Sequence, residues 1–102
     1  MGRVVTDAGR REELKRIGKA LARASRQEQG CLGYRLYEDT ENENEFVFVE
    51  EWESQEALER HFATSHIAEF MRAVPAAVAE RPDVKFHTVE RTVDLAELTG
   101  GR

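Results

Sequence analysis

The order in which helical and strand-like periodicities follow one another constrains the fold of this chain more than any other feature. Two stretches carry apolar residues at helical spacing: residues 10–26 and the region after Ser54. Four stretches alternate as strands do: residues 3–6, 31–37, 45–52 and 83–91. The order is βαββαβ, which predicts an α+β, ferredoxin-like domain with two helices on one face of a four-stranded antiparallel sheet.

Each helical stretch has its own apolar stripe. In the first, the stripe consists of Leu14, Ile17, Gly18, Leu21 and Ala24. In the second, Ser54 is a suitable N-cap residue, and the stripe begins with Ala57, Leu58, His61 and Phe62. Thr64 and Ser65 interrupt it, and it resumes with Ile67, Phe70, Met71 and Val74. We therefore expect helical structure on both sides of this interruption.

The hairpin formed by residues 31–37 and 45–52 is apolar on both faces. In the second strand, Phe46, Phe48, Glu50 and Trp52 share one face, and Val47, Val49 and Glu51 share the other. In the first strand, Leu32, Tyr34 and Leu36 are expected to oppose Cys31, Arg35 and Tyr37. Because the helices cover only one face of the sheet, the other would be an exposed apolar patch on a monomer. We therefore expect a homodimer that buries this patch by sheet-to-sheet contact.

Length and charge limit the other classes of function. The 102 residues fit a single domain, expected to span residues 1–91 with a C-terminal tail at 92–102. The net charge of −5, with basic and acidic residues mixed along the first helix, argues against nucleic-acid binding. No apolar run approaches the roughly 20 residues of a membrane span, and no signal-peptide pattern is visible. A single cysteine excludes an intrachain disulfide, so a cytoplasmic location is expected.

The sequence predicts neither a bound cofactor nor a metal ion. Cys31 is the only cysteine, and no Gly-rich loop of the phosphate-binding kind is present. His61 and His66 are separated by about 140° on a continuous helix. On that spacing they would not converge on one ion, and no carboxylate–histidine cluster with ligand spacing is evident nearby. His87 stands alone on a strand, where a structural role is expected.

An ordered set of short motifs resembles the antibiotic biosynthesis monooxygenase family. It comprises Glu28 to Tyr34 (EQGCLGY), Phe46, Glu50-Glu51-Trp52, Ala57-Leu58, His61 and Ser65-His66. Asp7 to Leu14 (DAGRREEL) is similar to that family's first turn and helix start, so the resemblance covers about residues 3–89. It implies a dimeric α+β barrel. It also implies oxygenation of quinols or polycyclic phenols without metal or flavin, although some members degrade heme and related barrels isomerise small metabolites.

The chain departs from the patterns of two family subgroups. Members that oxygenate aromatic polyketides have an Asn four residues before the tryptophan and a Tyr six residues after it, where this chain has Phe48 and Leu58. Heme-degrading members have a His ten residues beyond the tryptophan, where this chain has Phe62, and an Asn in the first strand, which this chain lacks. These departures argue against heme degradation and leave the substrate undefined.

The motifs and the face assignments select a small set of candidate site residues. His66 is the candidate catalytic base, because a neutral imidazole is favoured near a helix N-terminus and accepts a proton near pH 7. The alternative is a histidine that only packs at the sheet edge. The candidate substrate-binding residues line a flat, largely apolar pocket: Trp52, Phe48, Glu50, Tyr34, Phe62, Phe70 and Met71. For each of them the alternative is a structural position in the core or at a strand end.

The leading hypothesis is a cofactor-independent monooxygenase that oxidises a quinol or hydroxyaromatic small molecule with O2. In that chemistry the substrate is the reductant, and the protein need supply only a base, hydrogen bonds to the substrate anion and a dry pocket. Two alternatives remain on the same barrel, namely a small-metabolite isomerase and a non-catalytic dimer that binds a small molecule. A monooxygenase consumes O2 with its substrate, an isomerase conserves mass, and a binding protein does neither.

Overall fold

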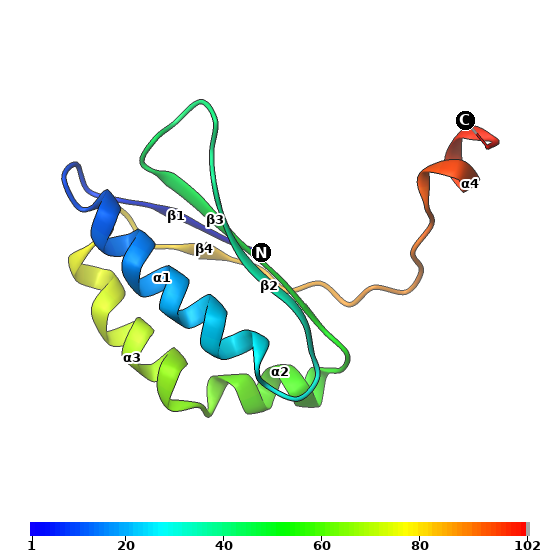
Figure 1. The fold of residues 1–102 in the computed structure, drawn as a ribbon, viewed down its shortest axis with the longest axis horizontal. Helices are drawn as coiled ribbons and strands as arrows, with labels where there is room; N and C mark the ends of the chain where they lie inside the picture. The colour runs from blue at the N-terminus through cyan, green and yellow to red at the C-terminus, as the bar shows by residue number, and fades with distance from the viewer. Residues whose placement is uncertain (102) are drawn as a thin grey trace.

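The computed structural model describes residues 1–101 and contains one four-stranded antiparallel sheet. The strands are β1 (Gly2–Val5), β2 (Cys31–Glu38), β3 (Glu45–Trp52) and β4 (Asp83–Val84), in the spatial order β2-β3-β1-β4. The helices are α1 (Arg11–Arg26), α2 (Gln55–Phe62), α3 (Ser65–Ala73) and α4 (Leu95–Thr99), with a 3-10 turn, η1, at Val74–Ala76. Figure 1 shows α1 and α3 side by side against one face of the sheet. The predicted α+β, ferredoxin-like fold is confirmed. No helix among the described residues is long and apolar enough to cross a bilayer.

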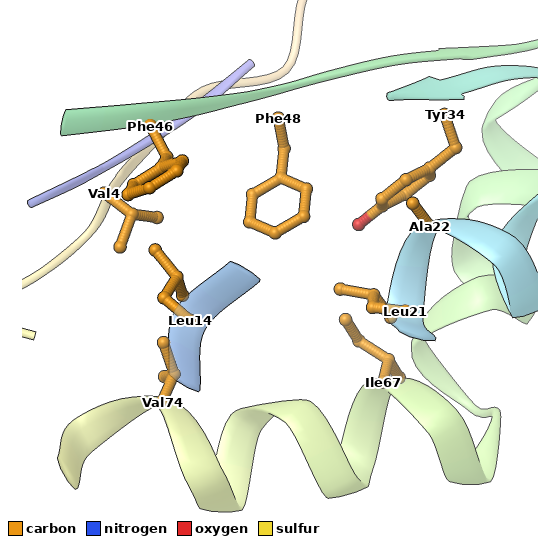
Figure 2. Close-up of a cluster of buried hydrophobic side chains, with 9 residues drawn as sticks. All are labelled: Val4, Leu14, Leu21, Ala22, Tyr34, Phe46, Phe48, Ile67 and Val74. Atoms are coloured by element: carbon orange, nitrogen blue, oxygen red, sulfur yellow. The ribbon is translucent and has the colours of Figure 1, made fainter. Parts of the chain in front are cut away.

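The core lies between the sheet and the pair α1 and α3. Figure 2 shows the aromatic side chains of β2 and β3 directed toward the aliphatic side chains of the two helices. The buried cluster consists of Val4, Leu14, Leu21, Ala22, Tyr34, Phe46, Phe48, Ile67 and Val74. Gly18 allows α1 to approach the sheet closely, since a Cβ at this position would stand 2.8 Å from Leu36 Cδ2 and 3.1 Å from the Phe48 ring.

In the hairpin, β3 follows its predicted alternation throughout, whereas β2 departs from it at one point. In β3, Phe46 and Phe48 are buried under the helices, whereas Val47 and Val49 are half-buried on the opposite face. In β2 the pairing register shifts between Cys31 and Gly33, so that Leu32 is an extra residue. The prediction that Leu32 shares a face with Tyr34 is wrong, because this bulge leaves Leu32 65% exposed and lets Cys31 pack against the core with Tyr34.

The last strand is much shorter than the predicted 83–91. Val84 pairs with Gly2, and Lys85 exchanges two backbone hydrogen bonds with Met1. The ladder with β1 therefore runs to the first residue of the sequence, and residues 86–91 find no partner on β1 in the described part of the chain. Figure 1 shows the chain leaving the sheet here and running outward to α4. The proposed domain boundary at residue 91 stays a prediction.

The interruption in the second helical region is a break between two helices. Ser54 caps α2 as predicted, accepting a hydrogen bond of 3.1 Å from the backbone amide of Ala57. Thr64 caps α3 through its hydroxyl, which accepts from the amide of Ile67 and donates to the carbonyl of His61. The chain therefore changes direction between His61 and His66, and their side chains do not follow the geometry of a continuous helix.

Candidate functional site

A cavity of about 300 Å³ lies between the sheet, α3 and the segment that follows β4. Its walls are mostly apolar, and six of the seven predicted substrate-binding residues line it: Tyr34, Phe48, Glu50, Phe62, Phe70 and Met71. The remaining wall consists of residues that the sequence did not single out for binding: Gly2, Val4, Leu21, His61, Ile67, Val74, Pro82, Val84 and Phe86. The structure thus gathers the predicted aromatic side chains around one space, while their contact with a substrate stays a prediction.

Trp52 stands behind this cavity and does not line it. Its indole Nε1 donates a hydrogen bond of 2.8 Å to Glu50 Oε1, and its ring centroid lies 4.7 Å from that of His61. Glu50 is therefore held by the Trp52 indole, and Tyr34 also forms a side-chain hydrogen bond with it. Trp52 in turn restricts the ring orientation of His61, which does line the cavity.

Two histidines share one carboxylate oxygen at the polar end of the cavity. His61 Nδ1 lies 2.7 Å from Glu28 Oε2, and His66 Nε2 lies 2.6 Å from the same atom. The side chains of His61, Glu28 and His66 are 1%, 13% and 24% exposed, respectively. His66, the predicted base, is therefore the outermost member of this cluster and is not part of the cavity wall.

The argument that no carboxylate–histidine cluster lies near these histidines is wrong. One ligand atom from each of Glu28, His61 and His66 falls within a group whose members are all within 4.8 Å of one another. The argument assumed a continuous helix, but Ala63 and Thr64 separate α2 from α3. The carboxylate comes from a third element, the loop after α1, which helical spacing could not reveal.

The loop that carries Glu28 is fixed by its backbone. The amide of Glu28 donates to the carbonyl of Ser25, and its own carbonyl accepts from the amide of Cys31. Gly30 follows with φ of +87°, and a Cβ there would lie 2.6 Å from Ala57 Cβ. Only glycine meets both demands, so Gly30 allows the loop to lie directly on α2 beside His61.

Tyr34 supplies a proton donor to the cavity. Burial raises the pKa of Tyr34 above its ordinary value, and the neighbouring Glu50 carboxylate raises it further. The phenol therefore stays protonated at neutral pH, and its side-chain hydrogen bond is to Glu50. Burial also raises the pKa of the Cys31 thiol, so this cysteine is not a ready nucleophile, in agreement with the expectation from sequence.

Glu28 fixes which nitrogen of His61 is available for chemistry. When Nδ1 carries the hydrogen and donates it to Glu28, Nε2 keeps its lone pair and can accept a proton from a molecule in the cavity. The carboxylate also stabilises the imidazolium that results, as the orienting carboxylate of a catalytic triad does. The arrangement therefore combines a base, a neutral donor and an apolar space large enough for one or two rings.

Sequence reasoning did not anticipate that Glu28 and His61 meet beside the cavity. Both residues were part of the motif string that carries the family resemblance, so a signal was present. Nothing in the local sequence around either residue indicates that the loop after α1 and the end of α2 meet. The wall formed by Val84 and Phe86 was also missed, because those residues were assigned to an extended strand.

Comparison with known proteins gives a consistent result. A model of a family described as "Antibiotic biosynthesis monooxygenase" matches residues 1–73. The uncharacterized protein sll1783 of Synechocystis is 31% identical over 94 residues, which are 92% of this chain and 64% of that protein. The Bacillus subtilis protein named "Putative monooxygenase YcnE" is 36% identical over 62 residues, which are 61% of this chain and 65% of that protein. The chain thus spans just under two thirds of the length of both curated relatives.

A solved structure extends the similarity to three dimensions. The crystal structure of PA3566 from Pseudomonas aeruginosa is 32% identical to this chain and superposes with a TM-score of 0.75. The match covers 86% of this chain and 90% of the other. The similarity therefore extends over most of the chain and is not confined to one motif.

Proposed function

The chain belongs to the antibiotic biosynthesis monooxygenase family, and from that premise we propose that it is a monooxygenase that oxidises a quinol or other hydroxyaromatic molecule with O2. One observation carries the proposal: His61, held by Glu28, stands at the polar end of an apolar cavity. We assign His61 as the base that meets the substrate. His66, the base expected from sequence, takes the role of the second histidine on Glu28, at the solvent side.

The cavity supports a small aromatic substrate. Its volume of about 300 Å³ is at the lower end of the range for small-molecule sites, which favours one or two rings. Phe48 and Phe70 meet edge to face with ring centroids 5.4 Å apart, and this geometry leaves ring faces and edges for a further aromatic partner. Glu50 and Tyr34 are polar groups of the wall that would orient substrate oxygens.

The proposed reaction needs only groups that the chain supplies, together with substrate and O2. His61 Nε2 takes the proton of a phenolic hydroxyl, and the Tyr34 hydroxyl turns from Glu50 to donate its hydrogen bond to the resulting anion. The anion passes one electron to O2, and the two radicals recombine to a peroxide on a ring carbon. The peroxide anion takes up one proton, equivalent to the one that His61 removed, and loss of water from the resulting hydroperoxide leaves a carbonyl, so one oxygen atom enters the product and the other becomes water. All the electrons come from the substrate.

A proton path away from the cavity follows from the shared carboxylate. The proton gained by His61 lies next to Glu28, and Glu28 in turn contacts His66, whose side chain is 24% exposed. His66 can therefore return the proton to solvent and restore the neutral His61. On this proposal, His66 supports turnover and His61 performs the deprotonation.

A homodimer is the second part of the proposal. The sheet face opposite the helices carries Val47 and Val49, and Tyr37 beside them is 54% exposed. The helices leave this face uncovered, and a second copy of the chain would bury it. Light scattering at low micromolar concentration should give twice the chain mass of 11.7 kDa. A monomeric mass there would contradict this arrangement.

Oxygen uptake tests the function directly. We expect the protein to consume O2 with at least one member of a panel of quinols and polyphenols, faster than each compound autoxidises. The product should contain one added oxygen atom, detected by mass spectrometry with ¹⁸O2. A product of unchanged mass would favour the isomerase, because the same base and donor also serve proton transfer at carbon. Tight binding without turnover across the panel would favour the small-molecule-binding dimer.

A further inference from the structure

We propose that Glu28, His61 and His66 form a binding site for one divalent transition-metal ion, with Zn²⁺ as the ion that the ligands fit best. Each residue contributes one ligand atom, and all three atoms lie within 4.8 Å of one another. Two imidazoles with one carboxylate are the protein ligands of several catalytic zinc sites, which keep a further position open. The same combination also binds Fe²⁺ in other enzymes, so the inference concerns the class of first-row divalent ions.

The present spacing of the three atoms is close to that of a coordination sphere. Metal–ligand distances of about 2.1 Å in a tetrahedral site place neighbouring ligand atoms about 3.4 Å apart. Here Glu28 Oε2 lies 2.7 Å from His61 Nδ1 and 2.6 Å from His66 Nε2. Each contact must open by less than about 1 Å to admit an ion. Side-chain rotation of Glu28 and His66, which are the less buried members, is sufficient for that change.

The charge around Glu28 favours a cation. Its side chain is only 13% exposed, and the structure pairs it with the two histidines and with no lysine or arginine among residues 1–101. A buried carboxylate is costly unless a positive charge compensates it. A divalent ion between the three side chains would supply such a charge.

The three ligands are also held in place before any ion arrives. Glu28 sits in a loop fixed by backbone hydrogen bonds to Ser25 and Cys31. His61 belongs to the last turn of α2, and His66 to the first turn of α3 beyond the Thr64 cap. The partial exposure of His66 gives an ion a route from solvent. Binding of an ion would therefore require little further loss of conformational entropy in the ligand residues.

A metal ion bound by the cluster would change the chemistry of His61. An imidazole that ligates a metal through Nδ1 is neutral only with its hydrogen on Nε2. His61 would then have no lone pair for a phenolic proton, so a bound ion would inhibit the proposed monooxygenase. This consequence rests on the proposed function, whereas the metal site itself does not.

Metal binding is best measured on the full chain without an affinity tag and after treatment with a chelator. Equilibrium dialysis against Zn²⁺ with elemental analysis should give one ion per chain. Co²⁺ should give a visible absorption band whose intensity reports the coordination number. Loss of an outer-shell partner costs roughly 10–100-fold in metal affinity, so Glu28→Gln and His66→Ala should each lose at least about 100-fold. His87→Ala is the matched control, since His87 lies outside the cluster, and it should bind Zn²⁺ as the wild type does.

Circular dichroism of the variants separates loss of ligand from loss of fold, and Glu28→Gln preserves side-chain shape. Failure of the wild type to bind stoichiometric Zn²⁺ or Co²⁺ would overturn the site. Equal binding by folded Glu28→Gln, or an equal loss in His87→Ala, would overturn it as well. If the ion binds as expected but O2 uptake continues undiminished, the metal site stands and the assignment of His61 as base fails.

Discussion

The two ends of the cavity are held together by different forces. At the apolar end, side chains such as Phe48 and Phe70 meet through ring contacts. At the polar end, short hydrogen bonds determine orientation: Glu28 bridges two histidines, and Glu50 accepts from Trp52. Apolar contacts depend weakly on direction, whereas a hydrogen bond weakens steeply when it is misaligned. The polar end should therefore control the rate of the reaction, and the apolar end should control how strongly the substrate binds.

Substitution of His61 tests the polar end and should have the largest effect. His61→Gln keeps a polar side chain of similar size in a buried position but removes the base. A positioned base contributes about 10²–10⁴ to a rate, so kcat for O2 uptake should fall by that factor. His66→Ala removes only the outer histidine and should lower kcat by less, about tenfold, while Glu28 and His61 remain paired.

The relative loss of kcat in His61→Gln and His66→Ala decides which histidine is the base. Circular dichroism must show that both variants are folded, since His61 is 1% exposed. A folded His61→Gln with the wild-type rate, next to an inactive His66→Ala, would return the base to His66. Similar losses in both variants would mean that the two histidines act as one unit and that the proton path is as important as the base.

Substitution of Phe70 tests the apolar end and should have an intermediate effect. Phe70 is partly buried and contacts the ring of Phe48. Phe70→Leu keeps an apolar wall but removes an aromatic contact worth about 1 kcal/mol, which corresponds to roughly a fivefold rise in KM. Steady-state O2 uptake should show kcat within about twofold of the wild type. A selective fall in kcat would show that the two ends do not divide their tasks.

Tyr34 belongs to both ends, and its ionisation should give the smallest effect. Burial and the Glu50 carboxylate raise the pKa of Tyr34 above the ordinary 10.0. Above that pH the unfolded chain releases the phenolic proton while the folded chain retains it. The unfolded state then binds fewer protons, so the stabilisation present below pH 10 is progressively lost as pH rises.

Melting temperatures from pH 8 to pH 11 check this linkage. Tyr34→Phe should show a shallower alkaline decline than the wild type, because the group that causes this part of the slope is gone. Tyr37→Phe is the control, since Tyr37 is exposed and lies on the opposite face of β2. Parallel curves for Tyr34→Phe and the wild type would show that the buried phenol is not the source of the decline.

Periodicity predicted those elements whose stability comes from one buried face. Leu14, Gly18 and Leu21 of the α1 stripe and the alternation of β3 agree with the structure, because burial between the sheet and the helices determines which side chains face inward. The predicted α1 stripe is incomplete, since Ala22 and Ser25 are buried and Ala24 is only half-buried. The same reasoning gave the wrong face for Leu32, because a bulge adds one residue at this point and no local sequence pattern indicates the bulge. The length of β4 depends on how far β1 extends to pair with it, which is a property of another part of the chain.

The candidate site also has one part that the sequence predicts and one part that it does not. The aromatic wall could be predicted because Tyr34, Phe48 and Phe70 are inward-facing positions of regular elements. The cluster of Glu28, His61 and His66 could not, since it depends on a helix break and on a loop that meets α2 only in three dimensions. The sequence shows Thr64 and Ser65 only as an interruption of a helical pattern, and the change of direction that the break at Ala63 and Thr64 produces is visible only in the packed structure.

That short break lies next to both the cavity wall and the polar cluster. His66 and Ile67 are neighbours on α3, and Ile67 lines the cavity while His66 touches Glu28. A ligand that pushes α3 outward would rotate this helix about the Thr64 cap. The distance between His66 Nε2 and Glu28 Oε2 would then increase. Adding or removing one residue at this pivot would leave each helix intact but swing His66 away from its partner. The length of this two-residue connection and the Thr64 cap within it therefore determine the geometry of the cluster.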